Sequence, residues 1–283
     1  MMVTVIIPTV NRYKYLVNAI DSIFKFSSEH IEELIIVDQT PRHLFSDDFY
    51  RILESKKLPV RWKHIKKMGQ STARNLGISE AQTEFIYLYE DDGEATDDII
   101  GEHIKIIKKY KNACTTGPSH APWKTREMLP DNAKIESYTT IFSTGNALIR
   151  KASWKRINGF DLNFDNGMGA DSDFGTRLYL SGFEVVQAPE AIMVHHKAKT
   201  GGLRTFGAFW LHSFNLFKPY PPITTLYQLG KYYSTPILFI MSMRLVLLSI
   251  KEKGFFKNIP LIILFPFLFS YSFYRAQKCK KHF

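Results

Sequence analysis

Short apolar runs alternate with amphipathic stretches through the first two-thirds of the chain. The mainly apolar runs cover residues 3–8, 34–37 and 85–89, and residues 60–65 are predicted as a further strand. Residues 13–26 instead carry their apolar side chains three and four positions apart, which is typical of a helix with one buried face. Buried strands that alternate with helices predict a parallel sheet with right-handed crossovers, and hence an α/β fold.

Weaker elements continue this pattern to residue 196. We expect further helices at 49–58, 68–77 and 97–110 and from Asp171 onward, and further strands at 113–118, 184–188 and 191–194. The helix at 68–77 follows a glycine turn and is predicted to have a local Ser/Thr cap. Residues 119–137 contain two prolines and mixed charge, and are predicted to form a long loop near the site.

The strand at 85–89 ends abruptly in the acidic sequence Glu90-Asp91-Asp92. Open α/β sheets bind their ligands at the carboxyl ends of the strands. Crowded carboxylates repel each other unless a cation neutralises them, and their hard oxygen atoms favour Mg²⁺ or Mn²⁺. The stretch therefore predicts a divalent metal site that holds a phosphorylated substrate. The alternative is a solvated acidic turn.

Asp38 ends the second strand and so is expected at the same edge of the sheet. A carboxylate there can accept hydrogen bonds from a ribose or a base, although it can also cap a turn. No Gly-x-Gly-x-x-Gly motif follows the first strand, and no P-loop motif occurs. These absences argue against NAD and against ATP held in a P-loop.

Three later positions are further candidates for the site. Asp171 opens a helix, where it is either a general base or a carboxylate stabilised by the helix dipole. His195, the first of two adjacent histidines, is a metal ligand or a structural residue. Gly145 either lets the backbone approach a ligand or forms a plain turn.

Six short motifs, in a fixed order over residues 3–196, resemble those of the family 2 glycosyltransferases, which have the GT-A fold. They are Val5-Ile6-Ile7-Pro8-Thr9-Val10-Asn11-Arg12, Ile36-Val37-Asp38-Gln39-Thr40, Gly69-Gln70-Ser71-Thr72-Ala73-Arg74-Asn75, Glu90-Asp91-Asp92, Gly159-Phe160-Asp161 and Asp171-x-Asp173-x-x-x-Arg177. The resemblance implies a Rossmann-like, mostly parallel sheet flanked by helices. It also implies a glycosyltransferase of the hexosyltransferase class, which transfers a sugar from a nucleotide sugar to an acceptor hydroxyl with inversion.

The resemblance assigns roles to these positions. Asp171 is the expected base, and Asp92 and Glu90 are the expected ligands for Mn²⁺ or Mg²⁺. His195, from the histidine pair after a strand, is a further expected metal ligand. The residues expected to contact the nucleotide sugar are Pro8, Thr9, Asn11, Arg12, Asp38, Arg74 and Asp91. Two positions depart from the family pattern, because Glu90 replaces the first Asp of Asp-x-Asp and Ala170 replaces the Glu that often precedes the base.

The positive charge is concentrated in the C-terminal part of the chain. Residues 201–283 hold 11 Lys and Arg but one acidic residue, Glu252, whereas residues 1–200 hold 26 basic and 26 acidic residues. The basic residues of the tail flank long apolar runs. This arrangement favours an anionic membrane surface over nucleic acid as the partner.

Two apolar runs of 16 residues, 235–250 and 259–274, form the core of this tail, and Pro260 and Pro266 are expected to break the second. Each run would rise about 24 Å as a helix, less than the roughly 30 Å hydrocarbon core of a bilayer. We therefore expect helices that lie in or dip into the cytoplasmic leaflet, with two short spans as the alternative. The predicted domains are a catalytic domain at 1–218 and membrane-associated helices at 219–283.

A membrane-bound enzyme suggests a lipid-linked saccharide acceptor and a role in cell-surface polysaccharide biosynthesis. The start of the chain does not resemble a signal peptide, and Cys114 and Cys279 match no metal or redox spacing, so we expect the cytoplasmic face of the cell membrane. Two alternatives remain, a nucleotidyltransferase that makes a sugar nucleotide and a non-catalytic membrane-bound scaffold. The first would need a Gly-rich basic loop directly after the first strand, where Pro8 to Arg12 stand instead.

Overall fold

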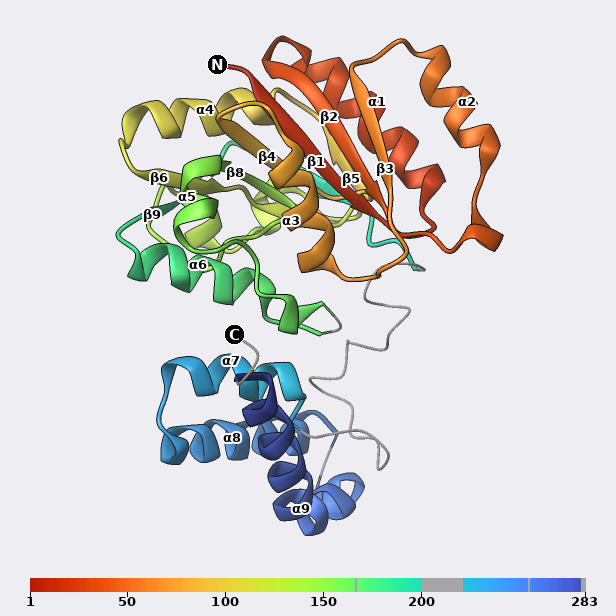
Figure 1. Ribbon diagram of the computed structural model, residues 1–283. Helices are drawn as coiled ribbons and strands as arrows, with labels where there is room; N and C mark the ends of the chain where they lie inside the picture. The colour runs from red at the N-terminus through yellow and green to blue at the C-terminus, as the bar shows by residue number, and fades with distance from the viewer. Residues whose placement is uncertain (166, 200–220, 254, 281–283) are drawn as a thin grey trace. The chain divides into compact units, whose positions relative to one another are not determined.

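The computed structural model describes residues 1–165, 167–199, 221–253 and 255–280 (Figure 1). The chain divides into two compact units. One comprises Met1–Asp165 and Ala170–Gly202, and the other Asn166–Gly169 and Leu203–Phe283. The predicted domain boundary after residue 218 lies outside the described residues.

A seven-stranded sheet forms the centre of the first unit, in the order β3-β2-β1-β4-β8-β6-β9. The strands are β1 (Val3–Thr9), β2 (Ile31–Asp38), β3 (Val60–His64), β4 (Phe85–Tyr89), β6 (Ala113–Thr116), β8 (Asn146–Arg150) and β9 (Glu184–Gln187). Strand β8 runs antiparallel to both of its neighbours, and the other pairings are parallel. The prediction of a mostly parallel sheet is thus confirmed.

Alternate side chains of the strands fill two hydrophobic layers, one on each face of the sheet. The helices are α1 (Tyr13–Ser27), α2 (Asp47–Ser55), α3 (Gln70–Glu80), α4 (Ile99–Lys109), α5 (Lys151–Arg156) and α6 (Ala170–Leu180). Val5 and Ile7 of β1 pack with residues of α1 and α4, whereas Ile6 between them packs with residues of α3 and α6. Helices therefore cover both faces, and the carboxyl ends of the central strands stay available for a site.

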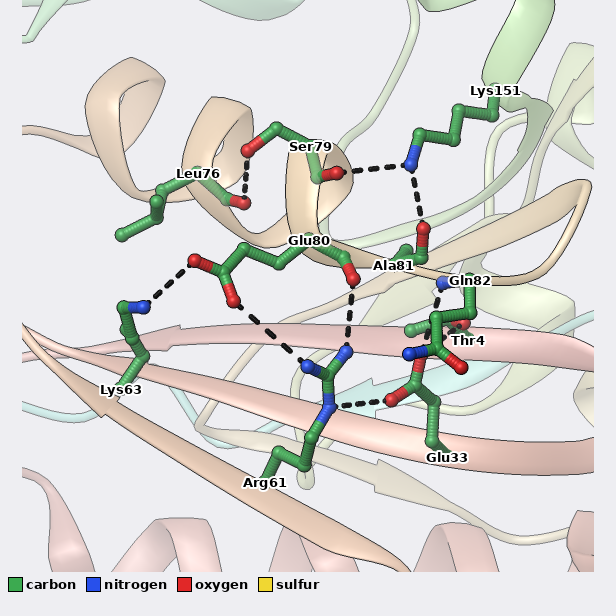
Figure 2. Close-up of polar contacts among 10 residues, drawn as sticks. All are labelled: Thr4, Glu33, Arg61, Lys63, Leu76, Ser79, Glu80, Ala81, Gln82 and Lys151. Carbon is green, nitrogen blue, oxygen red and sulfur yellow. Dashed lines mark hydrogen bonds and ion pairs between the residues drawn. The ribbon is translucent and has the colours of Figure 1, made fainter.

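Helix α3 is tied down at both ends by side chains distant in sequence. At its C-terminal end, Lys63 and Arg61 from β3 bind the Glu80 side chain and carbonyl at 2.7 and 2.9 Å (Figure 2). At its N-terminal end, the Asp165 carboxylate accepts hydrogen bonds from Thr72 N at 2.8 Å and Thr72 Oγ1 at 2.6 Å. The predicted local Ser/Thr cap was wrong, because the capping carboxylate comes from a loop 93 residues further along the chain.

A second, three-stranded sheet lies in the same unit, in the order β5-β10-β7. Its strands are β5 (Gly93–Ala95), β10 (Met193–His195) and β7 (Ser119–His120). Strand β5 begins directly after Asp92, and Gly93 pairs with His195 in the antiparallel register. The pairing of β5 with β10 therefore joins the acidic sequence and the histidine pair in one sheet. Part of the predicted long loop at 119–137 forms the third strand of this sheet.

The second unit is helical, with α7 (Ile223–Tyr232), α8 (Thr235–Lys253) and α9 (Phe255–Lys280). Val246 of α8 packs against Leu261 and Phe265 of α9. Helix α9 continues through Pro260 and Pro266, so the predicted break there was wrong. Its apolar part, Ile259–Cys279, is 21 residues long and is the one helix of the described residues with the length and composition to cross a membrane.

Candidate active site

The turn between β1 and α1 is fastened to the acidic sequence. Asp91 is 5% exposed and accepts hydrogen bonds from Thr9 Oγ1 at 2.7 Å and from Arg12 Nη1 at 2.8 Å. Pro8 precedes Thr9 in β1, and Asn11 turns the chain with a left-handed φ of 51°. Both carboxylate oxygens of Asp91 therefore already serve to hold the turn predicted to contact the nucleotide.

Asp92, Glu90 and His195 converge into a group that fits a divalent cation. Their potential ligand atoms all lie within 4.8 Å of one another. His195 Nε2 is 3.2 Å from Glu90 Oε2 and 3.4 Å from Asp92 Oδ1. Asp92 Oδ1 is buried without a hydrogen-bond partner among the described residues. His195 and Arg12 lie 3.4 and 3.6 Å from this oxygen and offset its charge, and the oxygen keeps the capacity to bind a cation. Two carboxylates with one imidazole are suitable ligands for Mn²⁺ or Mg²⁺.

The three-stranded sheet brings this group together. The backbone N–H of His196 donates to the Asp92 carbonyl at 2.9 Å, and that of Ala198 donates to Asp92 Oδ2 at 2.8 Å. His196 itself is paired with Glu94 at 2.6 Å. Of the two histidines, His195 thus faces the acidic group, while His196 is held by a carboxylate outside it.

The charges around the metal group act in opposite directions on its carboxylates. Burial opposes ionisation of Asp92, but His195 and Arg12 outweigh it and lower the pKa of Asp92 to about 2. Burial raises the pKa of Glu90, against the attraction of His195. Burial likewise raises the pKa of Asp91, against the charge of Arg12. Asp92 is therefore the carboxylate of the cluster that is most firmly ionised.

Gly145 makes room for the Glu90 side chain. The Gly145 carbonyl accepts a hydrogen bond from the Glu90 N–H at 3.2 Å. A Cβ at position 145 would lie 2.6 Å from Glu90 Cδ, closer than such contacts occur. Gly145 thus accommodates Glu90, a predicted metal ligand, and the predicted approach of this backbone to a bound molecule stays a prediction.

Asp38 lies at the carboxyl end of β2, as predicted, but it is fully buried. Its Oδ2 accepts a hydrogen bond from the Tyr13 hydroxyl and its Oδ1 one from the Thr40 N–H, both at 2.8 Å. Thr40 Oγ1 in turn accepts a hydrogen bond from the Asn11 N–H at 2.7 Å. In this structure Asp38 therefore braces the turn after β1, as the turn-cap alternative describes.

Arg74 of α3 is a buried cation and not a surface helix residue. It is 6% exposed, and its Nη1 donates to Gln70 Oε1 at 3.0 Å. Its guanidinium lies over the Phe160 ring, 5.9 Å from the centroid, and its charge reaches Glu90. Its Nε has no hydrogen-bond partner among the described residues. Such a donor beside a cation site is suited to an anionic ligand.

Asp171 lies in the first turn of α6, and its Oδ1 accepts a hydrogen bond from Thr144 Oγ1 at 2.7 Å. Its charge acts on Glu90, which places it beside the metal group. Asp173 has a different task, because it binds Arg177 Nε at 2.7 Å. Arg177 also donates to the carbonyl groups of Ile157 and Gly159 at 2.6 and 2.7 Å. The motif therefore supplies one site carboxylate and one structural ion pair.

Two residues with a clear part in the site were not predicted. Thr144 is 1% exposed and orients Asp171, and Asp165 caps α3, the helix that carries Arg74. Thr144 had a weak signal in its neighbourhood, because it precedes the glycine that we noted. Asp165 had none, since a distant cap leaves no local pattern.

Comparison with known proteins agrees with this geometry. The sequence profile described as Glycosyl transferase family 2 matches residues 4–162, more than half of the chain. The chain belongs to this family. A second profile, described as N-terminal domain of galactosyltransferase, matches residues 129–199, which include the motifs at Gly159-Phe160-Asp161 and Asp171-x-Asp173-x-x-x-Arg177. The predicted family is thus confirmed, and with it the class of enzyme.

One curated relative of this family 2 chain is an uncharacterized glycosyltransferase from Rickettsia felis. It is 31% identical over 109 residues, which are 38% of this chain and 17% of the relative. The chain therefore matches only about a sixth of that protein's length.

Solved structures establish the GT-A fold. Staphylococcus aureus TarS 1-349 in complex with UDP-GlcNAc has a TM-score of 0.61 at 17% identity, covering 82% of this chain and 66% of its own. The mannosyltransferase PcManGT from Pyrobaculum calidifontis, in complex with GDP-Man and Mn²⁺, has a TM-score of 0.59 at 17% identity, covering 98% and 73%. GalNAc-T7 with UDP, GalNAc and Mn²⁺ has a TM-score of 0.58 at 13% identity, covering 69% and 44%.

Proposed function

We propose that this chain is a metal-dependent, inverting glycosyltransferase that moves a sugar from a nucleotide sugar to an acceptor hydroxyl. The observation that carries the proposal is the metal group of Asp92, Glu90 and His195, in which the buried Asp92 Oδ1 accepts no hydrogen bond from the described residues. Two of the structural neighbours were solved with Mn²⁺ and a nucleotide or nucleotide sugar. That fact supports the same pairing of metal and donor here.

The residues around the metal group have different proposed roles in binding the donor. A bound Mn²⁺ or Mg²⁺ offsets negative charge on the leaving nucleoside diphosphate. Arg74, with its unpartnered Nε, is positioned to bind the same anion. The turn that contains Pro8, Thr9, Asn11 and Arg12 is held rigid by Asp91 and Asp38, which suits it for orienting the donor.

Asp171 is the proposed general base. Its Oδ1 is fixed by Thr144, which leaves Oδ2 to accept the proton of an attacking hydroxyl. One in-line displacement inverts the anomeric centre, with the bond to the leaving diphosphate breaking on the opposite face. The departure from the family pattern at Ala170 leaves this carboxylate in place.

The experiment that tests the proposal is donor hydrolysis. The full chain is incubated with Mn²⁺ or Mg²⁺ and a panel of UDP-, GDP- and dTDP-sugars, and the released nucleoside diphosphate is measured. We expect release from one donor that falls at least about 100-fold with EDTA or with Asp92→Asn, because both remove charge stabilisation of the leaving group. Glu80→Gln, at the far end of α3, is the matched control and should retain activity.

If no donor releases its diphosphate in the presence of a membrane lipid extract, the proposed activity is wrong. Undiminished release from Asp92→Asn would show instead that the metal group does not take part.

We also propose that α8 and α9 attach the enzyme to the cytoplasmic face of an anionic membrane and that the acceptor is a lipid-linked saccharide used for surface polysaccharide. Both helices expose large apolar side chains, among them Ile240 and Leu247 of α8 and Ile263 and Phe267 of α9. At about 1.5 Å per residue, the apolar part of α9 is about 32 Å long, enough to span a bilayer core.

Sedimentation with vesicles of anionic and neutral phospholipids tests the membrane proposal. The full chain should sediment with the anionic vesicles, and Ile263→Ser with Phe267→Ser should weaken this binding, because both substitutions remove exposed apolar surface. The pair Lys105→Ser with Lys134→Ser, on the first unit, is the control. Equal sedimentation of all three proteins would contradict a role for α9.

A further inference from the structure

An exposed tryptophan lies on a fixed turn close to the metal group. Trp123 is 69% exposed, although the neighbouring Ala121 is 1% exposed. The Lys124 N–H donates to the Ala121 carbonyl at 2.9 Å and closes the turn. Arg126, just beyond it, forms an ion pair with Glu190. The indole is thus displayed to solvent by a segment that is held in place on both sides.

The three-stranded sheet connects this turn to the site. Strand β7 runs parallel to β10, with Ser119 opposite Met193 and His120 opposite Val194. The chain therefore leaves β7 beside His195 and reaches Trp123 three residues later. Lys197, two residues after His195, has its Nζ 6.0 Å from the centroid of the Trp123 ring.

The order of the strands decides on which side of the metal group Trp123 lies. Strand β10 is in the middle, β5 with the adjoining Asp92 is on one side, and β7 is on the other. Arg12, on the donor side, contacts Asp91 and lies 3.6 Å from Asp92. Trp123 follows β7, which lies on the opposite side of β10 from β5. Trp123 is thus on the side of His195 that faces away from Asp92.

We propose that Trp123 is a platform on which a sugar ring of the acceptor stacks, a role that rests on the proposed glycosyl transfer. A pyranose has one face of C–H groups that packs well against a flat aromatic ring, while its hydroxyl groups stay in water. Lys197 holds the indole by a cation–π contact and leaves most of the ring open to solvent. The platform selects an acceptor that presents a saccharide ring and not a bare lipid or a protein hydroxyl.

Saturation-transfer NMR with simple saccharides tests the platform without knowledge of the acceptor. The probes are the methyl glycosides of glucose, N-acetylglucosamine and mannose, with mannitol as a polyol that has no ring, added to the full chain with Mg²⁺ and nucleoside diphosphate. We expect saturation of the protons on one pyranose face for at least one glycoside and none for mannitol. Trp123→Ala should reduce the effect at least about fivefold, and Trp123→Phe should keep part of it.

Met128→Ala is the matched control, since Met128 is 62% exposed on the same segment and has no ring to offer. It should behave as the wild type. No transfer to any glycoside, or equal transfer in Trp123→Ala, would overturn the proposal. So would a Trp123→Ala protein that loses only its binding to anionic vesicles, because the indole would then be a membrane contact.

Donor hydrolysis separates this proposal from the proposed function. Trp123→Ala should release nucleoside diphosphate at the wild-type rate, which also shows that the variant is folded. If the wild type hydrolyses no donor but still shows Trp123-dependent saturation transfer, the glycosyl transfer fails and the saccharide platform stands. If it hydrolyses a donor without that transfer, the platform alone fails.

Discussion

The two ends of α3 lie in two clusters of charged side chains with opposite character. The cluster at the C-terminal end consists of Glu33, Arg61, Lys63 and Glu80, and we call it the ion-pair network. Each of its carboxylates forms an ion pair with a basic side chain, and the side chains are partly exposed. Toward the N-terminal end, the charge of Arg74 acts on Glu90 of the acidic cluster (Glu90, Asp91 and Asp92), where Arg74 Nε and Asp92 Oδ1 lack hydrogen-bond partners among the described residues.

The difference shows which property marks the functional end. Both clusters are rich in charge, so charge alone does not distinguish them. Exposed and paired charges contribute little and need nothing further, whereas buried donors and acceptors without partners are costly. Arg74 Nε donates no hydrogen bond to the described residues, and Asp92 Oδ1 accepts none from them beside its ion pairs with His195 and Arg12, so an anion and a cation could bind them.

The largest difference between the two clusters is expected from Asp171→Asn, because the charge of Asp171 acts on Glu90 of the acidic cluster. Loss of the general base should lower the rate of transfer about 1,000-fold, while donor hydrolysis by water falls less, because water needs less activation by that carboxylate. Both rates are measured with the donor that the hydrolysis panel selects. Glu80→Gln is the control at the other end and should leave both rates within about twofold of wild type. A comparable loss in the two variants would remove the distinction.

The next test asks whether burial of a polar residue, or the lack of a hydrogen-bond partner, marks the functional site. It uses a residue that is buried and has hydrogen-bond partners. His103 is fully buried, and its ring nitrogens lie 2.8 Å from Thr115 Oγ1 and 2.9 Å from Asn146 Oδ1. Burial lowers the pKa of His103 from 6.5 to about 4. Between these values the unfolded chain binds the extra proton, so the free energy of unfolding falls as the pH drops from 6.5 toward 4.

The shifted pKa of His103 makes the free energy of unfolding on the order of 3 kcal/mol larger above pH 6.5 than it is at about pH 4. Urea unfolding at several pH values measures it, and His103→Gln should flatten the dependence over this interval. Turnover at neutral pH should change little. A variant with the wild-type pH dependence would show that His103 does not stay neutral in the folded protein.

The smallest effect concerns the stability of the metal-free enzyme. Glu90 is crowded by Asp92 and Asp171, and burial raises its pKa. In EDTA, Glu90→Gln should therefore raise the melting temperature by about 2–4 °C, although it removes a predicted metal ligand. Glu80→Gln should lower it slightly, because an exposed ion pair is lost. Shifts of the same sign in both variants would contradict the contrast between the two clusters.

The sequence was sufficient for most of the fold because its signals are local. The strands β1, β2 and β4 are built around apolar runs, and each run is followed by a polar residue that the parallel sheet brings to one edge. The grouping of Glu90, Asp92 and His195 was predicted from such positions and from the family resemblance.

What the sequence could not provide depends on contacts between distant segments. Asp165 caps a helix 93 residues before it, and the partners of Asp38 follow from the way the turn after β1 folds back. The prolines of α9 were read as breaks, whereas the helix continues through both. Local propensity does not reveal how tertiary packing offsets the cost of an interior proline.

Gly145 offers a charge-neutral way to perturb the metal group. Gly145→Ala adds a single methyl group, which would lie 2.6 Å from Glu90 Cδ, so the Glu90 side chain must shift. Every charge and every proposed ligand stays in the chain. A protein with this one-codon change therefore tests whether the position of the Glu90 carboxylate, and not its charge, matters for activity.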